Sequence, residues 1–171
     1  QTGSANSIVP IIKRFQQDEN LSLGVLAESP ASEVFSKESI NFNIVQEQPS
    51  PQDLISVIEQ SSFDLVLVGT SSGHPQHPEV LEKNMIKASK IFGIPSIAVA
   101  DIWARFRPVF GDEEQQDQGF SALPTKVAVM NEASRQQMLA EGFLDSIIVV
   151  TGNPYFDDII QLKQNWQSSD T

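Results

Sequence analysis

The turn after the most hydrophobic segment of the chain carries the residues best suited to bind a ligand. This turn, Gly69-Thr70-Ser71-Ser72-Gly73, directly follows the apolar run at residues 63–68. Sugars and phosphates suit hydroxyl groups and free backbone amides, because both kinds of ligand form several hydrogen bonds. The alternative is a loop that only caps the next helix. We therefore predict a substrate-binding site at Gly69, Thr70, Ser71 and Ser72.

A second turn of small residues opens the chain and contains Gly3 and Ser4. Where such a turn starts a helix, its backbone N–H groups and the serine hydroxyl can hold an anion such as a phosphate. The G-x-G-x-x-G fingerprint of dinucleotide-binding folds is absent, so we expect no cofactor. Gly3 and Ser4 are candidate substrate-binding residues, and the alternative is a plain tight turn.

Aromatic and basic residues follow another apolar segment, at residues 94–100. Arg105 could bind a phosphate or carboxylate through two hydrogen bonds, and Trp103 could stack on a sugar or a base. We expect both at the same sheet edge as the turn after residue 68. Alternatively, Trp103 and Phe106 pack under an acidic loop, and Arg105 and Arg107 pair with the acidic residues 112–114.

The candidates for acid–base chemistry are Asp101 and His74. His74 and His77 lie in a His-Pro-Gln-His-Pro stretch, and a histidine there could act as a general acid or base. A metal site needs at least one more ligand, such as Glu79 or Asp101, and the spacing fixes neither. We therefore expect no metal site, and the alternative is a pair of surface histidines. The catalytic residues stay undefined, with Asp101 and His74 as weak candidates.

Charge and composition argue against several classes of partner. The chain has 171 residues and a formal net charge of −11, which repels nucleic acids and anionic lipids. It contains no cysteine, so thiolate metal ligands and cysteine nucleophiles are excluded. No apolar run approaches the roughly 18 residues of a membrane span, and the start does not look like a signal peptide. We expect a cytoplasmic protein.

The elements that must position these residues alternate along the whole chain. This alternation predicts one doubly wound α/β domain over residues 1–171, with a mostly parallel, Rossmann-like sheet and an acidic, mobile loop at 111–121. In such sheets ligands bind beyond the carboxyl ends of the strands, where the turns described above should meet. The expected strands are residues 21–27, 40–45, 63–68, 94–100, 126–130 and 147–150, and the expected helices are 5–15, 30–36, 51–61, 79–92, 132–141 and 155–166.

One strand of this pattern is missing from the chain. The turn at residues 2–6 leads directly into a helix, whereas in doubly wound folds such a turn follows the first strand. Right-handed crossovers place that strand in the middle of the sheet. Without it, two buried strands would keep unpaired backbone groups, each costing about 1–3 kcal/mol. We expect a strand that precedes Gln1 in the full protein, or one from another chain.

Several stretches together resemble the N-terminal Rossmann-like lobe of GT-B type glycosyltransferases and of the related UDP-N-acetylglucosamine 2-epimerases. They are Thr2-Gly3-Ser4-Ala5-Asn6-Ser7, Leu67-Val68-Gly69-Thr70-Ser71, Gly93-Ile94-Pro95-Ser96-Ile97-Ala98-Val99, and Val150-Thr151-Gly152-Asn153-Pro154 with Asp157. In that family two such lobes face each other, and the second usually holds most of the nucleotide-sugar contacts. The resemblance implies a nucleotide-sugar or sugar-phosphate ligand and a second lobe or protein partner.

The catalytic carboxylates of the epimerases have no counterpart here. Val68-Gly69-Thr70 stands where those enzymes have Gly-Asp-Thr, and Ala98-Val99-Ala100-Asp101-Ile102 stands where they have His-Val-Glu-Ala-Gly. We expect the substrate- or acceptor-side lobe of a glycosyltransferase-like, nucleotide-sugar-dependent enzyme. Such a lobe is inactive alone, because it cannot enclose its reactants and exclude water. The alternative is a non-catalytic binding or regulatory module that acts through a protein partner.

Overall fold

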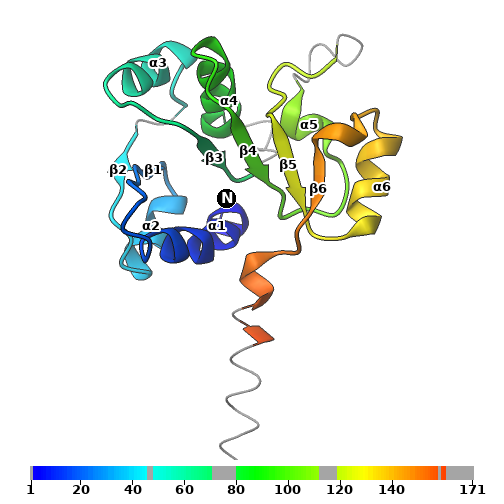
Figure 1. The fold of residues 1–171 in the computed structure, drawn as a ribbon, viewed down its shortest axis with the longest axis horizontal. Helices are drawn as coiled ribbons and strands as arrows, with labels where there is room; N and C mark the ends of the chain where they lie inside the picture. Colours follow the sequence, from blue (N-terminus) through cyan, green and yellow to red (C-terminus); the bar gives the residue numbers. More distant parts are fainter. Residues whose placement is uncertain (1, 46–47, 71–79, 112–118, 158, 161–171) are drawn as a thin grey trace, which may run out of the picture.

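Among the described residues the strands form two parallel sheets, one of two strands and one of four in the order β3-β4-β5-β6 (Figure 1). The computed structural model describes residues 2–45, 48–70, 80–111, 119–157 and 159–160. The strands are β1 (Leu26–Ala27), β2 (Asn43–Ile44), β3 (Val66–Val68), β4 (Ser96–Val99), β5 (Lys126–Val129) and β6 (Ile148–Val150). The helices are α1 (Thr2–Phe15), α2 (Ala31–Lys37), α3 (Pro51–Glu59), α4 (Leu81–Ile91), α5 (Arg107–Phe110) and α6 (Glu132–Ala140), with a short 3-10 turn, η2 (Asp145–Ile147).

The alternation of strands and helices confirms the predicted parallel α/β fold. Within the larger sheet Val68 pairs with Ala98, and Val99 pairs with Ala128. The strands therefore end at nearly the same level, which brings the turns after β3 and β4 to one edge of the sheet. We call this edge the carboxyl edge and the opposite one the amino edge.

Local sequence explains why α3 starts where it does. The Oγ of Ser50 accepts a hydrogen bond from the Asp53 N–H at 3.3 Å, and the Asp53 carboxylate accepts one from the Ser50 N–H at 2.8 Å. This reciprocal capping, with Pro51 at the first helical position, satisfies backbone donors that a helix start leaves free. α3 then buries Leu54 and Ile58, as its apolar spacing predicts.

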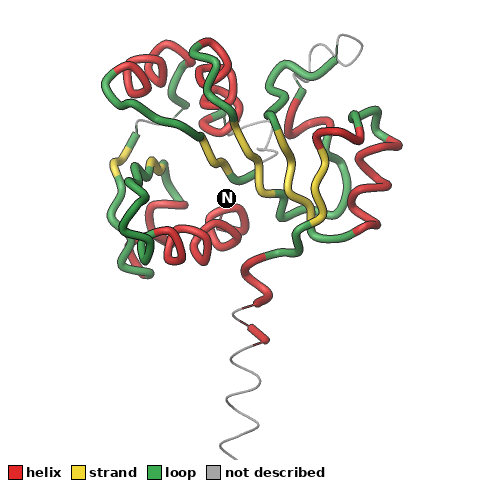
Figure 2. The backbone as a smooth tube through the Cα atoms, viewed as in Figure 1, coloured by secondary structure: helices red, strands yellow, loops and turns green. Residues whose placement is uncertain are grey.

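The buried side chains form two separate clusters. The main core joins the larger sheet to α3, α4, α5 and α6, and it includes Val68, Val127 and Phe143. Phe143 stacks on Phe120 with a centroid distance of 4.0 Å. The small core lies among α1, β1 and α2 and comprises Ala5, Val9, Ile12, Ala27, Phe35 and Ile40. In Figure 2 the two short strands β1 and β2 lie apart from the four strands of the larger sheet.

Three expected elements differ from the structure. The expected strand at 40–45 is reduced to β2, and Ile44 is 76% exposed because β2 has one strand beside it and contributes nothing to either core. The expected strand at 21–27 is likewise only β1, and the helix expected at 5–15 already begins at Thr2. Residues 154–157 and 159–160 are helical, and the rest of the expected last helix lies outside the described residues.

Candidate functional site

A threonine and an aspartate meet at the carboxyl edge. Thr70 comes two residues after β3 and Asp101 two residues after β4, so the register of the two strands places them side by side. The Thr70 Oγ1 donates a hydrogen bond to Asp101 Oδ1 at 2.9 Å and accepts one from the Asp101 N–H at 3.3 Å. Thr70 is 1% exposed, whereas Asp101 is only partly buried.

The first turn of α1 packs directly onto this pair. A Cβ added to Gly69 would collide with the Oγ of Ser4 and lie 3.1 Å from the Ser4 Cβ. A Cβ added to Gly3 would lie 2.7 Å from Asp101 Oδ2. Glycine at both positions thus lets α1 approach the sheet closely, because a side chain at position 3 would displace the Asp101 carboxylate and one at position 69 would displace the Ser4 side chain. We call the group formed by Gly3, Ser4, Gly69, Thr70 and Asp101 the carboxyl-edge site.

The charge of the carboxyl-edge site comes from Asp101. Burial raises the pKa of the Asp101 carboxyl above its ordinary value, and the hydrogen bond from Thr70 opposes this rise. The first turn of α1 has no acidic residue of its own, and the Asp101 carboxylate lies beside it, where the helix dipole favours negative charge. The ionised carboxylate accepts hydrogen bonds and repels phosphate. The site therefore suits the hydroxyl groups of a ligand better than an anion.

The chain after Asp101 leads away from the carboxyl edge. The Glu141 carboxylate accepts hydrogen bonds from the backbone N–H groups of Arg105, at 3.0 Å, and Arg107, at 2.8 Å. Glu141 directly follows α6, whose nine residues run about 13 Å back from the carboxyl end of β5. The backbone of Arg105 is thus anchored near the opposite end of α6, in a left-handed conformation with a φ of 65°.

Two alternatives for this segment can be compared with the structure. Trp103 is 56% exposed and Phe106 is fully buried in the main core, but most of the acidic loop under which the alternative places them lies outside the described residues. Arg107 contacts Glu141 through its side chain as well, with Nη1 donating to the Glu141 carbonyl at 3.0 Å, and its guanidinium lies over the Phe120 ring. The acidic residues 112–114, the proposed partners of the arginines, lie outside the described residues.

The structure thus unites five of the predicted site residues and leaves three without a described position. Ser71, Ser72 and His74 lie outside the described residues, as does His77. Within the part of the chain that the structure describes, no three histidine or acidic side chains come close enough to hold a metal ion. None of its described helices has the length and apolarity needed to cross a membrane.

Two relationships escaped the sequence analysis. The sequence marks Asp101 as a candidate acid or base, but it does not mark Asp101 as the hydrogen-bond partner of Thr70. The signal that could have paired them is that each residue follows the end of its strand by the same number of residues. Glu141 is missed altogether, because it lies 36 positions from Arg105 and no local pattern marks it.

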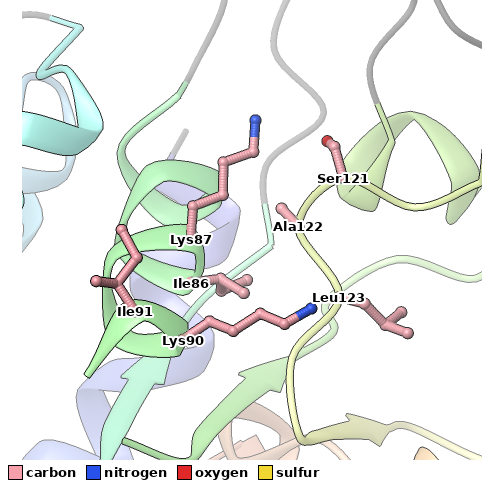
Figure 3. A pocket seen from close by; sticks show the side chains of 7 residues that line it. All are labelled: Ile86, Lys87, Lys90, Ile91, Ser121, Ala122 and Leu123. Atoms are coloured by element: carbon pink, nitrogen blue, oxygen red, sulfur yellow. The ribbon is translucent and has the colours of Figure 1, made fainter. Parts of the chain in front are cut away.

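A hollow of about 330 Å³ lies elsewhere on the molecule (Figure 3). It is lined by the second half of α4 and by the segment that leads into β5, and Figure 3 shows Lys90 extending from α4 toward Leu123. Both lining segments precede strands of the larger sheet, so the hollow is at the amino edge and shares no residue with the carboxyl-edge site.

Comparison with known proteins identifies the fold. No protein-family model matches the sequence, and no curated protein matches it. The crystal structure of a UDP-GlcNAc 2-epimerase from Neisseria meningitidis, bound to UDP-GlcNAc, matches with a TM-score of 0.61 and 19% identity, covering 96% of this chain and 48% of that chain. A protein assigned as a UDP-N-acetylglucosamine 2-epimerase from Listeria monocytogenes matches with a TM-score of 0.60 and 15% identity, covering 92% and 44%. The chain spans about half the length of these proteins, and the predicted fold, a Rossmann-like lobe like that of the epimerases, is confirmed.

Proposed function

We propose that this chain is the substrate-side lobe of a nucleotide-sugar-dependent enzyme and that the carboxyl-edge site contacts the sugar. The fold supports this proposal, since one of the similar structures holds UDP-GlcNAc and this chain spans about half its length. The observation that carries it is the convergence of Gly3, Ser4, Gly69, Thr70 and Asp101 at the sheet edge where α/β folds bind ligands.

The chemistry of the site favours the sugar over the phosphates. The Asp101 carboxylate is an acceptor for sugar hydroxyl groups, and Thr70 holds it in place through Oδ1. The diphosphate of a nucleotide sugar needs positive charge, which a second lobe would supply in this proposal. A lobe of this kind is inactive alone, because its site stays open to water.

Trp103 remains part of the proposal as an outer contact, and Arg105, whose backbone lies near the opposite end of α6, is kept as a separate candidate for binding a phosphate. Trp103 is exposed and follows Asp101 by two residues, so its ring is available to a ligand that extends beyond the carboxyl-edge site. The backbone of Arg105 is held by Glu141, and its role as a phosphate ligand is separable from that of Asp101.

Thermal unfolding with added ligands tests the proposal. A ligand that binds only the folded chain raises its melting temperature, and the stabilisation grows with the logarithm of ligand concentration over Kd. Millimolar UDP-GlcNAc should stabilise the chain, Asp101→Asn should reduce this shift, and Glu132→Ala, on the exposed face of α6, should leave it unchanged. Arg105→Ala should abolish the shift if that side chain binds phosphate. The absence of any shift with UDP-GlcNAc, UDP and inorganic phosphate contradicts the proposal.

The second candidate function is a non-catalytic binding module. It is favoured by Ala98 and Ala100, which are fully buried small residues at positions where the resembled epimerases carry histidine and glutamate. Activity measured after joining this chain to a second Rossmann-like lobe distinguishes the two functions. Turnover of a nucleotide sugar would support the enzyme lobe, and ligand binding without turnover would support the module.

A further inference from the structure

The hollow at the amino edge opens onto the main core. Ile86 and Ala122 line it, and both belong to that core, with exposed fractions of 2% and 1%. Leu123 also lines the hollow and packs against the same core. The volume of about 330 Å³ is at the lower end of the roughly 300–1,000 Å³ that small-molecule pockets occupy. The hollow therefore suits the apolar part of a small ligand.

Basic side chains follow one another along the face of α4 that borders the hollow. Lys83 and Lys87 are four positions apart, and Lys87 and Lys90 are three apart, so all three share one face of the helix. Lys87 and Lys90 line the hollow itself, and Figure 3 shows the Lys90 side chain extending from α4 toward Leu123. The Nζ of Lys83 donates to the Gly111 carbonyl at 2.7 Å. One face of α4 thus brings positive charge to the hollow.

The charge at the hollow is opposite to that of the chain as a whole. The sequence has 22 acidic and 11 basic residues, and its net charge of −11 repels anions in general. The seven residues that line the hollow, within the part of the chain that the structure describes, include two lysines and no acidic residue. Ser121 adds a hydroxyl group to the same lining. The hollow therefore complements a ligand that carries a negative charge.

The lining favours an anion with an apolar body over inorganic phosphate. A phosphate group needs several hydrogen-bond donors, and the backbone N–H of Ala122 is already bonded to the Phe110 carbonyl at 3.0 Å. Four of the seven lining residues are apolar, and one of them, Ile91, is 65% exposed at the rim. A ligand that covers this apolar surface removes it from water, which stabilises the complex. The lysines then need to balance only a single charged group.

We propose that the hollow between α4 and residues 121–123 is a second binding site, for a small carboxylate with an apolar chain. The chain of the ligand packs on Ile86, Ala122 and Leu123, and its carboxylate pairs with the ammonium group of Lys90. Lys90 is in the last turn of α4, where a basic side chain also balances the helix dipole, so a test must separate these two roles. This site shares no residue with the carboxyl-edge site and goes beyond the proposed function.

NMR titration with octanoate tests this site. The amide signals of Lys90, Ile91, Ala122 and Leu123 should shift in a saturable manner. Octyltrimethylammonium has the same apolar chain and a positive head group, and it should not produce these shifts, because the lysines repel it.

Two variants on α4 and one matched control locate the charged contact. Lys90→Met keeps an apolar side chain without the charge and should raise the Kd for octanoate about two- to fivefold, as expected for a solvent-exposed ion pair. Ile91→Asp adds a negative charge to the exposed rim and should raise the Kd further. Lys37→Met is the control, because Lys37 is in the last turn of α2, and it should leave the Kd unchanged.

Three results would overturn the proposal. The first is no saturable shift at millimolar octanoate, or equal shifts with octanoate and octyltrimethylammonium. The second is the same Kd for Lys90→Met and Lys37→Met, which would leave Lys90 with a purely structural role. The third is a shift of the same amides when the chain is diluted without octanoate, which would show that a second copy covers the hollow. Because no nucleotide sugar is added, these results are independent of the proposed function.

Discussion

Thr70 and Asp101, which lie 31 positions apart, are joined by a hydrogen bond of 2.9 Å from Thr70 Oγ1 to Asp101 Oδ1. This bond ties the end of β3 to the end of β4 and satisfies a partly buried carboxylate. It also orients that carboxylate beside the first turn of α1, where Gly3 leaves room for it. The remaining features of the carboxyl-edge site depend on this pair.

Thr70→Val should lower the free energy of unfolding by about 1–3 kcal/mol, because it leaves the Asp101 carboxylate without its donor. The pKa of Asp101 should rise further, since a hydrogen bond to the charged form is lost. Urea unfolding and NMR titration of the Asp101 carboxyl measure the two effects. Thr70→Ser keeps the hydroxyl and is the control, and equal behaviour of the valine and serine variants would contradict the assignment.

Asp101 should make the folded chain less stable as the pH rises above 3.8, its ordinary pKa. Burial raises the pKa of Asp101 in the folded chain, so between 3.8 and this raised value the folded state holds a proton that the unfolded state has released. Stability contributed by that proton is lost as the pH rises through this window. The variant Asp101→Asn has no titrating group at position 101. As the pH rises through this window, the free energy of unfolding of the variant should therefore increase relative to that of the unmodified chain.

Unfolding at a series of pH values measures this difference. A constant difference between the asparagine variant and the unmodified chain from pH 3 to 8 would show that burial does not raise the pKa of Asp101.

Gly69→Ala should destabilise the chain by about 1–3 kcal/mol, because the new Cβ collides with the Ser4 side chain. Adding Ser4→Ala removes the hydroxyl and should restore part of the loss, with a coupling of about 1 kcal/mol. Gly24→Ala is the matched control, since its Cβ would meet the Phe63 ring at an ordinary 3.4 Å. Additive effects at residues 4 and 69 in chemical denaturation would refute the contact between α1 and the end of β3.

Glu141→Ala should lower the free energy of unfolding by about 0.5–1.5 kcal/mol, because the backbone N–H groups of Arg105 and Arg107 lose their carboxylate acceptor. The NMR signal of the Asp101 carboxyl should stay unchanged, since Glu141 lies at the far end of α6. Glu132→Ala removes an exposed acid that pairs with Arg135 and should cost less stability than Glu141→Ala, because water screens an exposed ion pair. Equal losses in the two variants would mean that Glu141 is an ordinary surface acid.

Features encoded locally are those that the sequence predicts well. The apolar run at residues 63–68 indicates a buried strand, and Ser50 with Pro51 and Asp53 marks the start of α3. The parallel order of strands then brings Thr70 and Asp101 to one edge, as the rule for α/β sheets predicts. Gly3 and Ser4 lie beside Thr70 and Asp101, because the first turn of α1 is also at the carboxyl edge.

Contacts between distant segments could not be predicted in the same way. The bond of Glu141 to Arg105 depends on where a nine-residue helix ends relative to a loop, and nothing near either residue encodes that distance. The apolar spacing at 40–45 suggests a longer strand, yet Ile44 is exposed because the neighbouring core includes Ile40 and contacts Phe42 but does not reach Ile44. Periodicity identifies an apolar face but not whether another element covers it.

NMR titration with UDP-GlcNAc tests the central claim, that the carboxyl-edge site binds the sugar of a nucleotide sugar. The amide signals of Gly3, Gly69, Thr70 and Asp101 should shift in a saturable manner, and inorganic phosphate alone should shift them far less. Asp101→Asn should weaken the response to UDP-GlcNAc. Saturable shifts confined to the hollow between α4 and residues 121–123, or no saturable shift at all, would contradict the account.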